Sequence, residues 1–418
     1  MENKEFLIRG FSVFAFLFFG LSLAIPSGYS YGSVGMLLCG LIGVTALWKH
    51  SWRGETKLLV CIFWLMGLLW GISFDSLWSW TGSDLLWKYW LAALTLAAAA
   101  WWGIRPVAVE SGICAGAVGA LGIAAYQYLV LGWDKAWGYT NAIQFGGLAM
   151  YLGIAAWVVA LFTVQRWYWL GLIGVAGACG VLASLLSETR GAWVVVPLML
   201  ASLLLMLWQQ GRKRQSVVAV GAAICLLFAV ALPFAQKLES RVTRAVMELQ
   251  QYQHNPQHAA VTSVGQRLEQ WRFAWTLIQE KPVFGWGVQG FIDKKRSLVE
   301  QGRFHPSVLD YGHVHNEVLD MAAKRGVIGL SLLLLFYGLP LYVFWPTSSR
   351  LKSVTDQQRH HALAIRAAAS LLPIAYFGFG WTQVFFAHNS GNMFYLFAVA
   401  AFWGSLQYLE KRYNVEDT

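Results

Sequence analysis

The residues best suited to chemistry lie in the stretch YGHVHNEVLDMAAKRGVIGL, residues 311 to 330, where a His-Asn pair precedes an apolar run. The histidine, His315, could act as a general base because the ordinary pKa of an imidazole lies near neutral pH. If one helix contains it and the glycines that follow, Gly326 and Gly329 lie within about 40° of its direction. The imidazole would then stand above a small-residue face that a lipid-linked substrate could approach closely. Alternatively, the His-Asn pair only caps a helix.

Two arginines could bind a phosphate-bearing ligand. Arg190 lies in SETRGAW, on a short turn between two apolar runs, and Arg267 lies in a long polar loop. A guanidinium group can donate two parallel hydrogen bonds to phosphate oxygens. Either arginine could instead place its charge among lipid headgroups or in solvent. We therefore treat this pair as a candidate anion site that the loop and the turn share.

Other polar residues in these regions could support such a site. His313 is a close neighbour of the histidine above, and His388 begins a second His-Asn pair in AHNSGN. The supporting candidates are Asn316, His313, Arg272, Arg303, Glu188 and His388. The sequence contains no HExxH motif and no histidine cluster with metal-ligand spacing, so it predicts no metal and no other cofactor. Gly285, Gly287 and Gly290 match GxGxxG by letters, but no strand precedes them, and we interpret them as a tight turn.

The composition indicates what must position these residues. Hydrophobic residues make up 57% of the chain and charged residues 12%, with a mean hydropathy of +0.50. An ordinary soluble domain carries about a quarter charged residues, so a soluble enzyme is excluded. The sequence predicts an all-α polytopic membrane protein with about twelve transmembrane helices. The apolar runs fall at approximately 6–25, 31–48, 57–74, 86–104, 107–131, 141–163, 168–186, 191–208, 216–236, 326–346, 364–386 and 391–408.

The basic residues predict the orientation of these spans. Most Lys and Arg residues of the short connections lie on one side, whereas the other side holds Lys135 and Arg190, with Lys88 near a span end. Basic residues mark the cytoplasmic side, so both termini are predicted to be cytoplasmic. The net charge of +10 is thus interpreted as a topological signal, and no nucleic-acid partner is predicted.

The long polar loop lies on the opposite, periplasmic side in this topology. Its segments 238–253 and 262–280 alternate apolar and charged residues at helical spacing, which predicts two amphipathic helices. Thr262 or Ser263 could cap the second helix, and the Lys-Pro pair at 281 and 282 would end it. The chain divides into three predicted parts: residues 1–236 with helices 1 to 9, residues 237–325 with the loop, and residues 326–418 with helices 10 to 12 and a cytoplasmic tail.

The motifs resemble those of the O-antigen ligase and O-antigen polymerase superfamily of bacterial membrane glycosyltransferases, and most closely those of the ligases. The ligase pattern is His, then Asn or a similar residue, nine residues, Gly, two residues and Gly. It is matched by His315, Asn316, the nonapeptide EVLDMAAKR, Gly326 and Gly329. Similar segments are TRGAW at 189–193, VTSVGQRL at 261–268 and KPVFGWGVQGF at 281–291.

The resemblance implies an activity and its partners. Such ligases transfer a polysaccharide from undecaprenyl diphosphate to a sugar hydroxyl of the lipid A core, at the periplasmic face of the inner membrane, without nucleotide or metal. By resemblance, His315 is the catalytic base, and Arg190 and Arg267 bind the diphosphate. The implied partners are undecaprenyl diphosphate-linked O-antigen, the lipid A core oligosaccharide and membrane lipids. We expect inversion at the anomeric carbon, in a cavity that opens to the periplasm and sideways to lipid.

Other functions remain open at this point. An O-antigen polymerase would share the fold and the donor, and a protein O-oligosaccharyltransferase would use a Ser or Thr acceptor. The complete His-Asn spacing favours the ligase, and we expect the oligosaccharyltransferases to carry a larger C-terminal periplasmic region. A transporter of lipid-linked glycans would carry ionisable residues deep in several spans, whereas the charges here gather at the outer face.

Overall fold

The protein is a multi-pass membrane protein built of helices. The structure, a computed structural model, describes residues 2–42, 52–73, 80–163, 167–212, 221, 243–244, 246–352, 354–356 and 358–416. Across these residues all regular structure is helical and no strand occurs, so the predicted all-α class is confirmed. Six of the described helices are long and apolar enough to cross a membrane.

Eleven of the twelve predicted apolar runs overlap helices of a bundle, and the remaining run, 216–236, lies outside the described residues except for Gly221. The number of spans stays a prediction. The bundle helices are α1 (Glu2–Leu21), α2 (Gly28–Ile42), α4 (Gly54–Ser73), α5 (Trp80–Trp102), α6 (Pro106–Ala125), α7 (Ala142–Thr163), α8 (Trp167–Leu186), α9 (Arg190–Val194), α10 (Val196–Gln209), α15 (Glu317–Phe344), α16 (Ser348–Leu351), α17 (Arg359–Phe379) and α18 (Asn389–Glu416), with a π-helix at Tyr126–Val130 and a 3-10 turn at Phe385–Ala387.

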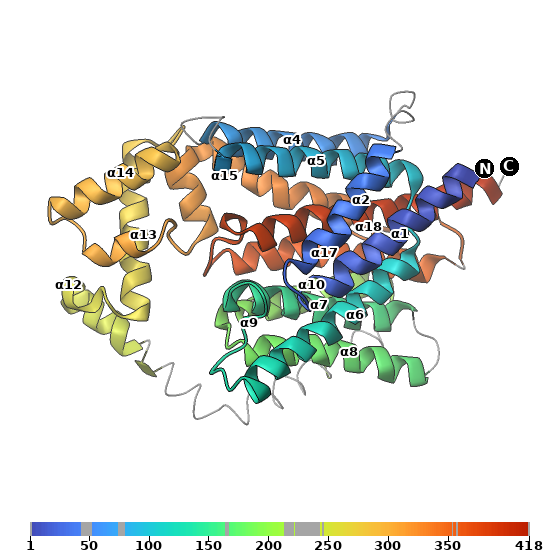
Figure 1. The fold of residues 1–418 in the computed structure, drawn as a ribbon, viewed down its shortest axis with the longest axis horizontal. Helices are drawn as coiled ribbons and strands as arrows, with labels where there is room; N and C mark the ends of the chain where they lie inside the picture. Colours follow the sequence, from blue (N-terminus) through green and yellow to red (C-terminus); the bar gives the residue numbers. More distant parts are fainter. Residues whose placement is uncertain are drawn as a thin grey trace.

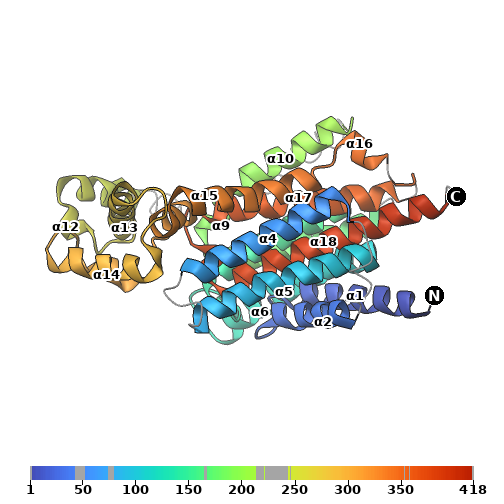
Figure 2. The same cartoon turned by 90° about the horizontal axis from the view of Figure 1, so that it is seen from above.

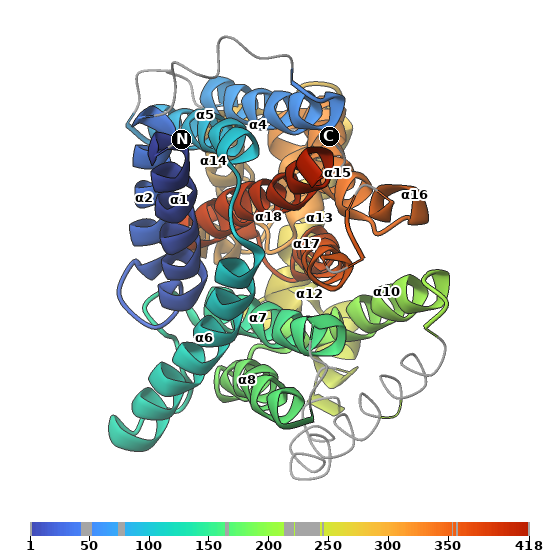
Figure 3. The same ribbon diagram turned by 90° about the vertical axis from the view of Figure 1, so that its right-hand side faces the viewer.

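Helices α17 and α18 lie at the centre of the bundle. Figure 3, a view along the bundle, shows α1, α2, α4, α5, α6, α7, α10 and α15 around them. Burial agrees: 94% of the apolar window of α17 is buried, against 33% for the window that contains α10. The alanines and glycines of α17 and α7 allow this close packing, because small side chains let helix backbones approach one another.

A small helical unit lies beyond one end of the bundle, and both termini lie at the other end (Figures 1 and 2). It comprises α12 (Pro256–Ala259), α13 (Ser263–Glu280), α14 (Gly287–Glu300) and a 3-10 turn at Pro306–Asp310. Phe273, Phe291 and Phe304 pack edge to face in its own small core. We call the end of the bundle next to this unit the site end.

The second amphipathic helix predicted in the loop is confirmed as α13. The side chain of Thr262 accepts a hydrogen bond from the backbone N–H of Gly265, and the helix ends before Lys281. Of the first predicted helix, residues 246–253 are helical, while part of 238–245 lies outside the described residues. Helix α14 was not predicted. The expected tight turn is present at Gly285 and Gly287, which both have positive φ, but Gly290 lies within α14.

The prediction that His315 and the motif glycines share one helix is wrong. Helix α15 begins only at Glu317, and Gly326 breaks its regular geometry with φ of +61°. The segment that follows α13 packs against α15 at this break, where Val327 N–H donates to the carbonyl of Pro282 at 2.8 Å. A Cβ on Gly326 would lie 2.1 Å from the Val283 carbonyl oxygen, so only glycine permits this approach. The glycine thus positions the loop and does not provide a smooth face below the histidine.

Candidate active site

The segment 311–316, which carries His315, is fixed from one side by the first turns of α15. Lys324 forms an ion pair with Asp320, at 2.8 Å, and both side chains are buried. Lys324 Nζ also donates to the carbonyl of Gly312 at 2.9 Å, and Asp320 Oδ1 accepts from Val314 N–H at 3.2 Å. A buried ion pair is favourable where further hydrogen bonds satisfy it, and here those bonds go to the backbone of the segment.

The helical unit fixes the same segment from the other side. Trp271 Nε1, on α13, donates to the carbonyl of Val314 at 3.1 Å, and Lys295 Nζ, on α14, donates to the carbonyl of Tyr311 at 2.8 Å. Burial, with a contribution from the nearby Lys324 charge, lowers the pKa of Lys295 to about 7. Three helices therefore determine the path of residues 311–316 through side-chain bonds to its backbone.

His315 stands at the end of this segment in a backbone conformation that few non-glycine residues adopt, with φ of +54°. Its ring is half-buried, and the rings of Tyr311 and His313 lie 4.4 and 4.6 Å away, both edge to face. Its Nδ1 lies 3.1 Å from Oε1 of Gln383, a buried residue of the turn after α17. Strained backbone of this kind persists where the surroundings determine it, and it is common at functional sites.

The pKa values of both neighbouring histidines are lowered. Burial, with a contribution from the Arg267 charge, lowers the pKa of His315 to about 4. Burial and the proximity of His315 lower the pKa of His313 to about 3. His315 is therefore a neutral imidazole at neutral pH, with one nitrogen able to accept a proton.

The two candidate diphosphate-binding arginines lie close to each other and to His315. Burial, followed by the charge of Arg190, lowers the pKa of Arg267, and the charge of Arg267 in turn lowers that of His315. Arg190 is exposed at the start of α9 and Arg267 is half-buried on α13. Arg190 and Arg267 are 77 positions apart in the chain, and Arg267 and His315 are 48 positions apart, so the fold brings distant segments together. An anion that binds near these residues would be stabilised by both positive charges.

The turn that carries Arg190 is held against the bundle. Thr189 Oγ1 donates to the carbonyl of Ala142 at 2.6 Å, and Glu188 before it has φ of +54°. A Cβ on Gly191 would lie 2.0 Å from Oγ1 of Thr382, so the glycine permits α9 to touch the turn that carries Gln383. The arginine turn and the partner of His315 are therefore direct neighbours.

The other candidates divide into two groups. Asn316 caps α15 by accepting from Leu319 N–H at 3.0 Å, so the asparagine alone fills the capping role considered for the pair. His388 lies near the site, with its ring centre 5.9 Å from that of His313. Arg272 instead pairs with Glu269 at 2.7 Å and stacks over Phe304, and its guanidinium donates to the carbonyl of the exposed Arg303. The side chain of Arg272 therefore serves the packing of the helical unit.

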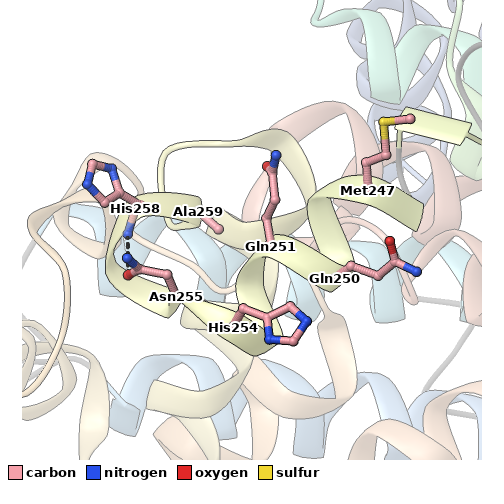
Figure 4. A pocket seen from close by; sticks show the side chains of 7 residues that line it. All are labelled: Met247, Gln250, Gln251, His254, Asn255, His258 and Ala259. Atoms are coloured by element: carbon pink, nitrogen blue, oxygen red, sulfur yellow. Dashed lines mark hydrogen bonds between the residues drawn. The ribbon is translucent and has the colours of Figure 1, made fainter.

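No sequence signal marks Gln383, which lies 68 residues from its partner within an apolar stretch. The Asp320–Lys324 pair does have a signal, because opposite charges four residues apart on a helix are neighbours and attract each other. A cavity of about 660 Å³ lies near α12 and contains none of the predicted site residues (Figure 4). The substrate cavity expected at His315 stays a prediction. Within the described ranges, no group of three His, Cys, Asp or Glu residues could hold a metal ion, and the metal-free reaction also stays a prediction.

Comparison with known proteins gives three findings. Residues 175–334 match the family model described as O-antigen ligase, a range that contains Arg190, Arg267 and His315. An uncharacterized protein of Haemophilus influenzae is 27% identical over 414 residues, which cover 96% of this chain and 100% of that protein. The O-antigen ligase of Escherichia coli is 24% identical over 195 residues, which cover 46% of this chain and 45% of that protein.

Proposed function

We propose that this chain, a member of the O-antigen ligase superfamily, is itself an O-antigen ligase: it transfers O-antigen polysaccharide from undecaprenyl diphosphate to a sugar hydroxyl of the lipid A core. The observation that carries the proposal is the neutral imidazole of His315 beside the paired charges of Arg190 and Arg267. A base next to an anion site suits the transfer of a sugar from a diphosphate carrier to an alcohol. The reaction would take place at the periplasmic face of the bacterial inner membrane.

In the proposed step, the basic nitrogen of His315 accepts the proton of the acceptor hydroxyl as its oxygen attacks the anomeric carbon. The new carbon–oxygen bond forms while the bond from that carbon to the diphosphate oxygen breaks, and undecaprenyl diphosphate leaves. Attack from the side opposite a held leaving group inverts the anomeric configuration. General-base assistance of this kind contributes about 100- to 10,000-fold to a rate.

Arg190 and Arg267 would stabilise the charge that develops on the leaving diphosphate. The charge of Arg190 disfavours the charged form of Arg267, so binding of the diphosphate would offset that effect as well as forming hydrogen bonds. Fixed donors aimed at a developing charge in a site that excludes water contribute roughly 3 kcal/mol each.

The donor would also tune the base. The Arg267 charge helps to keep the pKa of His315 low, and a bound diphosphate would offset that charge. The pKa of His315 would then rise towards the working pH, where a general base is most effective. Donor binding and activation of the acceptor would be coupled through one arginine.

Reconstitution tests the proposal. We would place the purified protein in liposomes with undecaprenyl diphosphate-linked O-antigen and offer, in parallel, core lipid, a second lipid-linked glycan and a Ser- or Thr-containing peptide. The ligase proposal expects transfer to core lipid alone. Elongation of the lipid-linked glycan would make the protein a polymerase, and a glycosylated peptide would make it an oligosaccharyltransferase. Loss of transfer after chelation would contradict the metal-free mechanism.

A further inference from the structure

We infer that Gln383 is a positioning residue that determines which nitrogen of His315 is basic, an inference that rests on the proposed function. Gln383 is 4% exposed, and its Oε1 lies 3.1 Å from His315 Nδ1. The same oxygen accepts from the backbone N–H of Val384 at 3.1 Å. One amide oxygen is thus shared by a backbone donor and the imidazole.

This sharing fixes the tautomer. A backbone N–H can only donate, so the atom of Gln383 that faces Val384 must be the oxygen of the amide. That oxygen can only accept, so His315 Nδ1 must carry the proton and donate it. A neutral imidazole has one N–H, which leaves the lone pair on Nε2. The nitrogen presented to the acceptor hydroxyl is therefore Nε2.

Hydrogen bonds connect the backbone next to His315 with the turn that carries Gln383. Glu317, the first residue of α15, donates its N–H to the carbonyl of Gly380 at 2.7 Å. Its buried carboxyl group accepts from Phe386 N–H at 3.1 Å. The turn that carries Gln383 is thus bonded on both sides to the residue two positions after His315, and these bonds hold the backbone of the two partners together.

The neutrality of the partner matters for this site. A carboxylate in place of the amide would also orient the ring, but its charge would raise the pKa of His315. It would also add a negative charge where a diphosphate is proposed to bind. The amide orients the ring without either effect, which suits a base that shares its site with an anion.

The test compares Gln383→Leu and Gln383→Glu with Gln270→Leu in the reconstituted full-length protein. Gln270 is equally buried and donates to the carbonyl of Val308, in the helical unit. Gln383→Leu should lower kcat roughly 10- to 100-fold, because orienting partners of this kind contribute that much, with little change in KM for the donor. Gln383→Glu should retain more activity, but its rise with pH should lie at higher pH than in the wild type, because a carboxylate raises the pKa of the base. Gln270→Leu should keep the pH profile of the wild type.

The outcomes separate this inference from the proposed function. If His315→Ala is inactive while Gln383→Leu keeps its rate and Gln383→Glu keeps the pH profile of the wild type, the role of Gln383 is wrong and the base assignment stands. If His315→Ala is active, the proposed function has failed. Nitrogen NMR of 15N-histidine protein gives a readout independent of activity, and a proton on Nε2 in the wild type would overturn the tautomer.

We propose a second site at the opposite end of the bundle, where both termini lie, on separate evidence: a cavity that binds one anionic glycerophospholipid. The cavity has a volume of about 990 Å³ and is lined by residues of α1, α6, α17 and α18. Arg9 bonds Glu5 at 3.0 Å, and Arg105 bonds the same carboxylate. Two guanidinium groups of the lining thus share one acid, which leaves an excess positive charge at the cavity.

Two further features of the lining indicate a lipid. The amide oxygen of Gln358 is buried and accepts no hydrogen bond within the described residues, so it would favour a headgroup that carries a hydroxyl. Val13 and Phe16, on the outer face of α1, are 55% and 37% exposed and would lie along an acyl chain. Basic cavities between membrane helices bind anionic headgroups, with the arginines on the phosphate. A hydroxylated anionic headgroup such as phosphatidylglycerol meets all three features.

Native mass spectrometry of the detergent-purified full chain tests this site. The double variant Arg9→Gln/Arg105→Gln should retain phosphatidylglycerol at least fivefold less than the wild type during delipidation. The control Lys57→Gln/Lys352→Gln removes two exposed charges that do not line the cavity, and it should retain the lipid. Equal retention by both double variants would overturn the site. Displacement of the lipid by millimolar inorganic phosphate would show a small-anion site and overturn the lipid assignment.

Discussion

The centre of the bundle and the site end are stabilised by different interactions. Around Phe402, in the bundle, aromatic and other apolar side chains pack together. At Val314, at the site end, the backbone N–H and the backbone carbonyl are both hydrogen-bonded to side chains of other elements. Phe402 packs against Phe19 and Phe344 inside regular helices, which satisfy their own hydrogen bonds. The segment 311–316 is irregular, so its backbone depends on bonds from other elements. The bundle therefore tolerates changes that preserve volume, and the site end depends on individual donors and acceptors.

The largest expected effect sharpens this contrast. His315→Ala removes the proposed base and should lower the transfer rate by about 100- to 10,000-fold, with little change in the temperature of unfolding. Phe402→Ala should do the reverse, costing about 3 kcal/mol of stability while each folded molecule keeps its rate. Both are measured by transfer in proteoliposomes and by thermal unfolding in detergent. An unfolding temperature lowered equally by both variants would contradict the separation of the two regions.

Two glycines of α15 test the contrast within one helix. Gly326→Ala places a Cβ against the Val283 carbonyl at positive φ and should cost about 1–3 kcal/mol or more. A Cβ on Gly338 meets nothing within 4 Å, so Gly338→Ala should change stability by less than about 1 kcal/mol, in favour of alanine. Unfolding and transfer are measured for both. If the two substitutions have the same effect, the close approach at Gly326 is not a constraint.

The sequence predicted most of the helices because apolar runs of membrane length have few other interpretations. It also predicted α13, since Thr262 and the Lys-Pro pair are local signals for its two ends. It did not predict the break at Gly326, because the cause is a loop that packs against it from more than forty residues away. The Gln383 contact is harder still, because a glutamine near the end of an apolar run carries no mark of its partner.

Among the site residues, too, some could be predicted from local sequence and others depend on contacts between distant segments. Spacing and resemblance selected His315, Arg190 and Arg267, which the structure brings together. The same reasoning also selected Arg272, but in the structure Arg272 forms an ion pair with Glu269. A charged residue on an amphipathic helix has the same appearance in sequence whether it faces a ligand or a neighbouring helix. Only the contacts of Arg272 in the folded protein, with Glu269, Phe304 and the Arg303 carbonyl, distinguish the two.

Arg190→Lys keeps the charge of the proposed anion site and removes the paired donors. We expect the KM for the lipid-linked donor to rise about tenfold, since a lysine cannot form two parallel bonds to a diphosphate. Arg303→Lys, an exposed change in the helical unit, is the control and should leave that KM unchanged. Donor titrations in proteoliposomes give both values. Equal KM values for Arg190→Lys and the wild type would indicate that Arg190 only contacts headgroups or solvent.

Acid should weaken the site end before the bundle. The pKa values of His313 and His315 are about 3 and 4 in the folded protein, below the ordinary 6.5. The unfolded chain therefore binds more protons below pH 6.5, so this contribution to stability is complete above that pH and is lost as the pH falls towards 4. The unfolding temperature should fall over this range, and less steeply in His313→Gln/His315→Gln. Parallel curves for the double variant, the wild type and the exposed control His258→Gln would contradict this.

The smallest effect tests whether a single hydrogen bond positions the segment that carries His315. Trp271→Phe keeps most of the ring and removes the bond from Nε1 to the Val314 carbonyl, which should cost about 1 kcal/mol. Because that bond holds the segment of His315, we expect the cost to appear as a lower kcat, roughly fivefold at this energy, with an unchanged donor KM. Trp286→Phe removes a matching bond, to the Leu277 carbonyl, within the same helical unit but away from the segment. It should change stability alone. An equal fall in kcat for both variants would mean that the site responds to the stability of the whole unit and not to the bond at Val314.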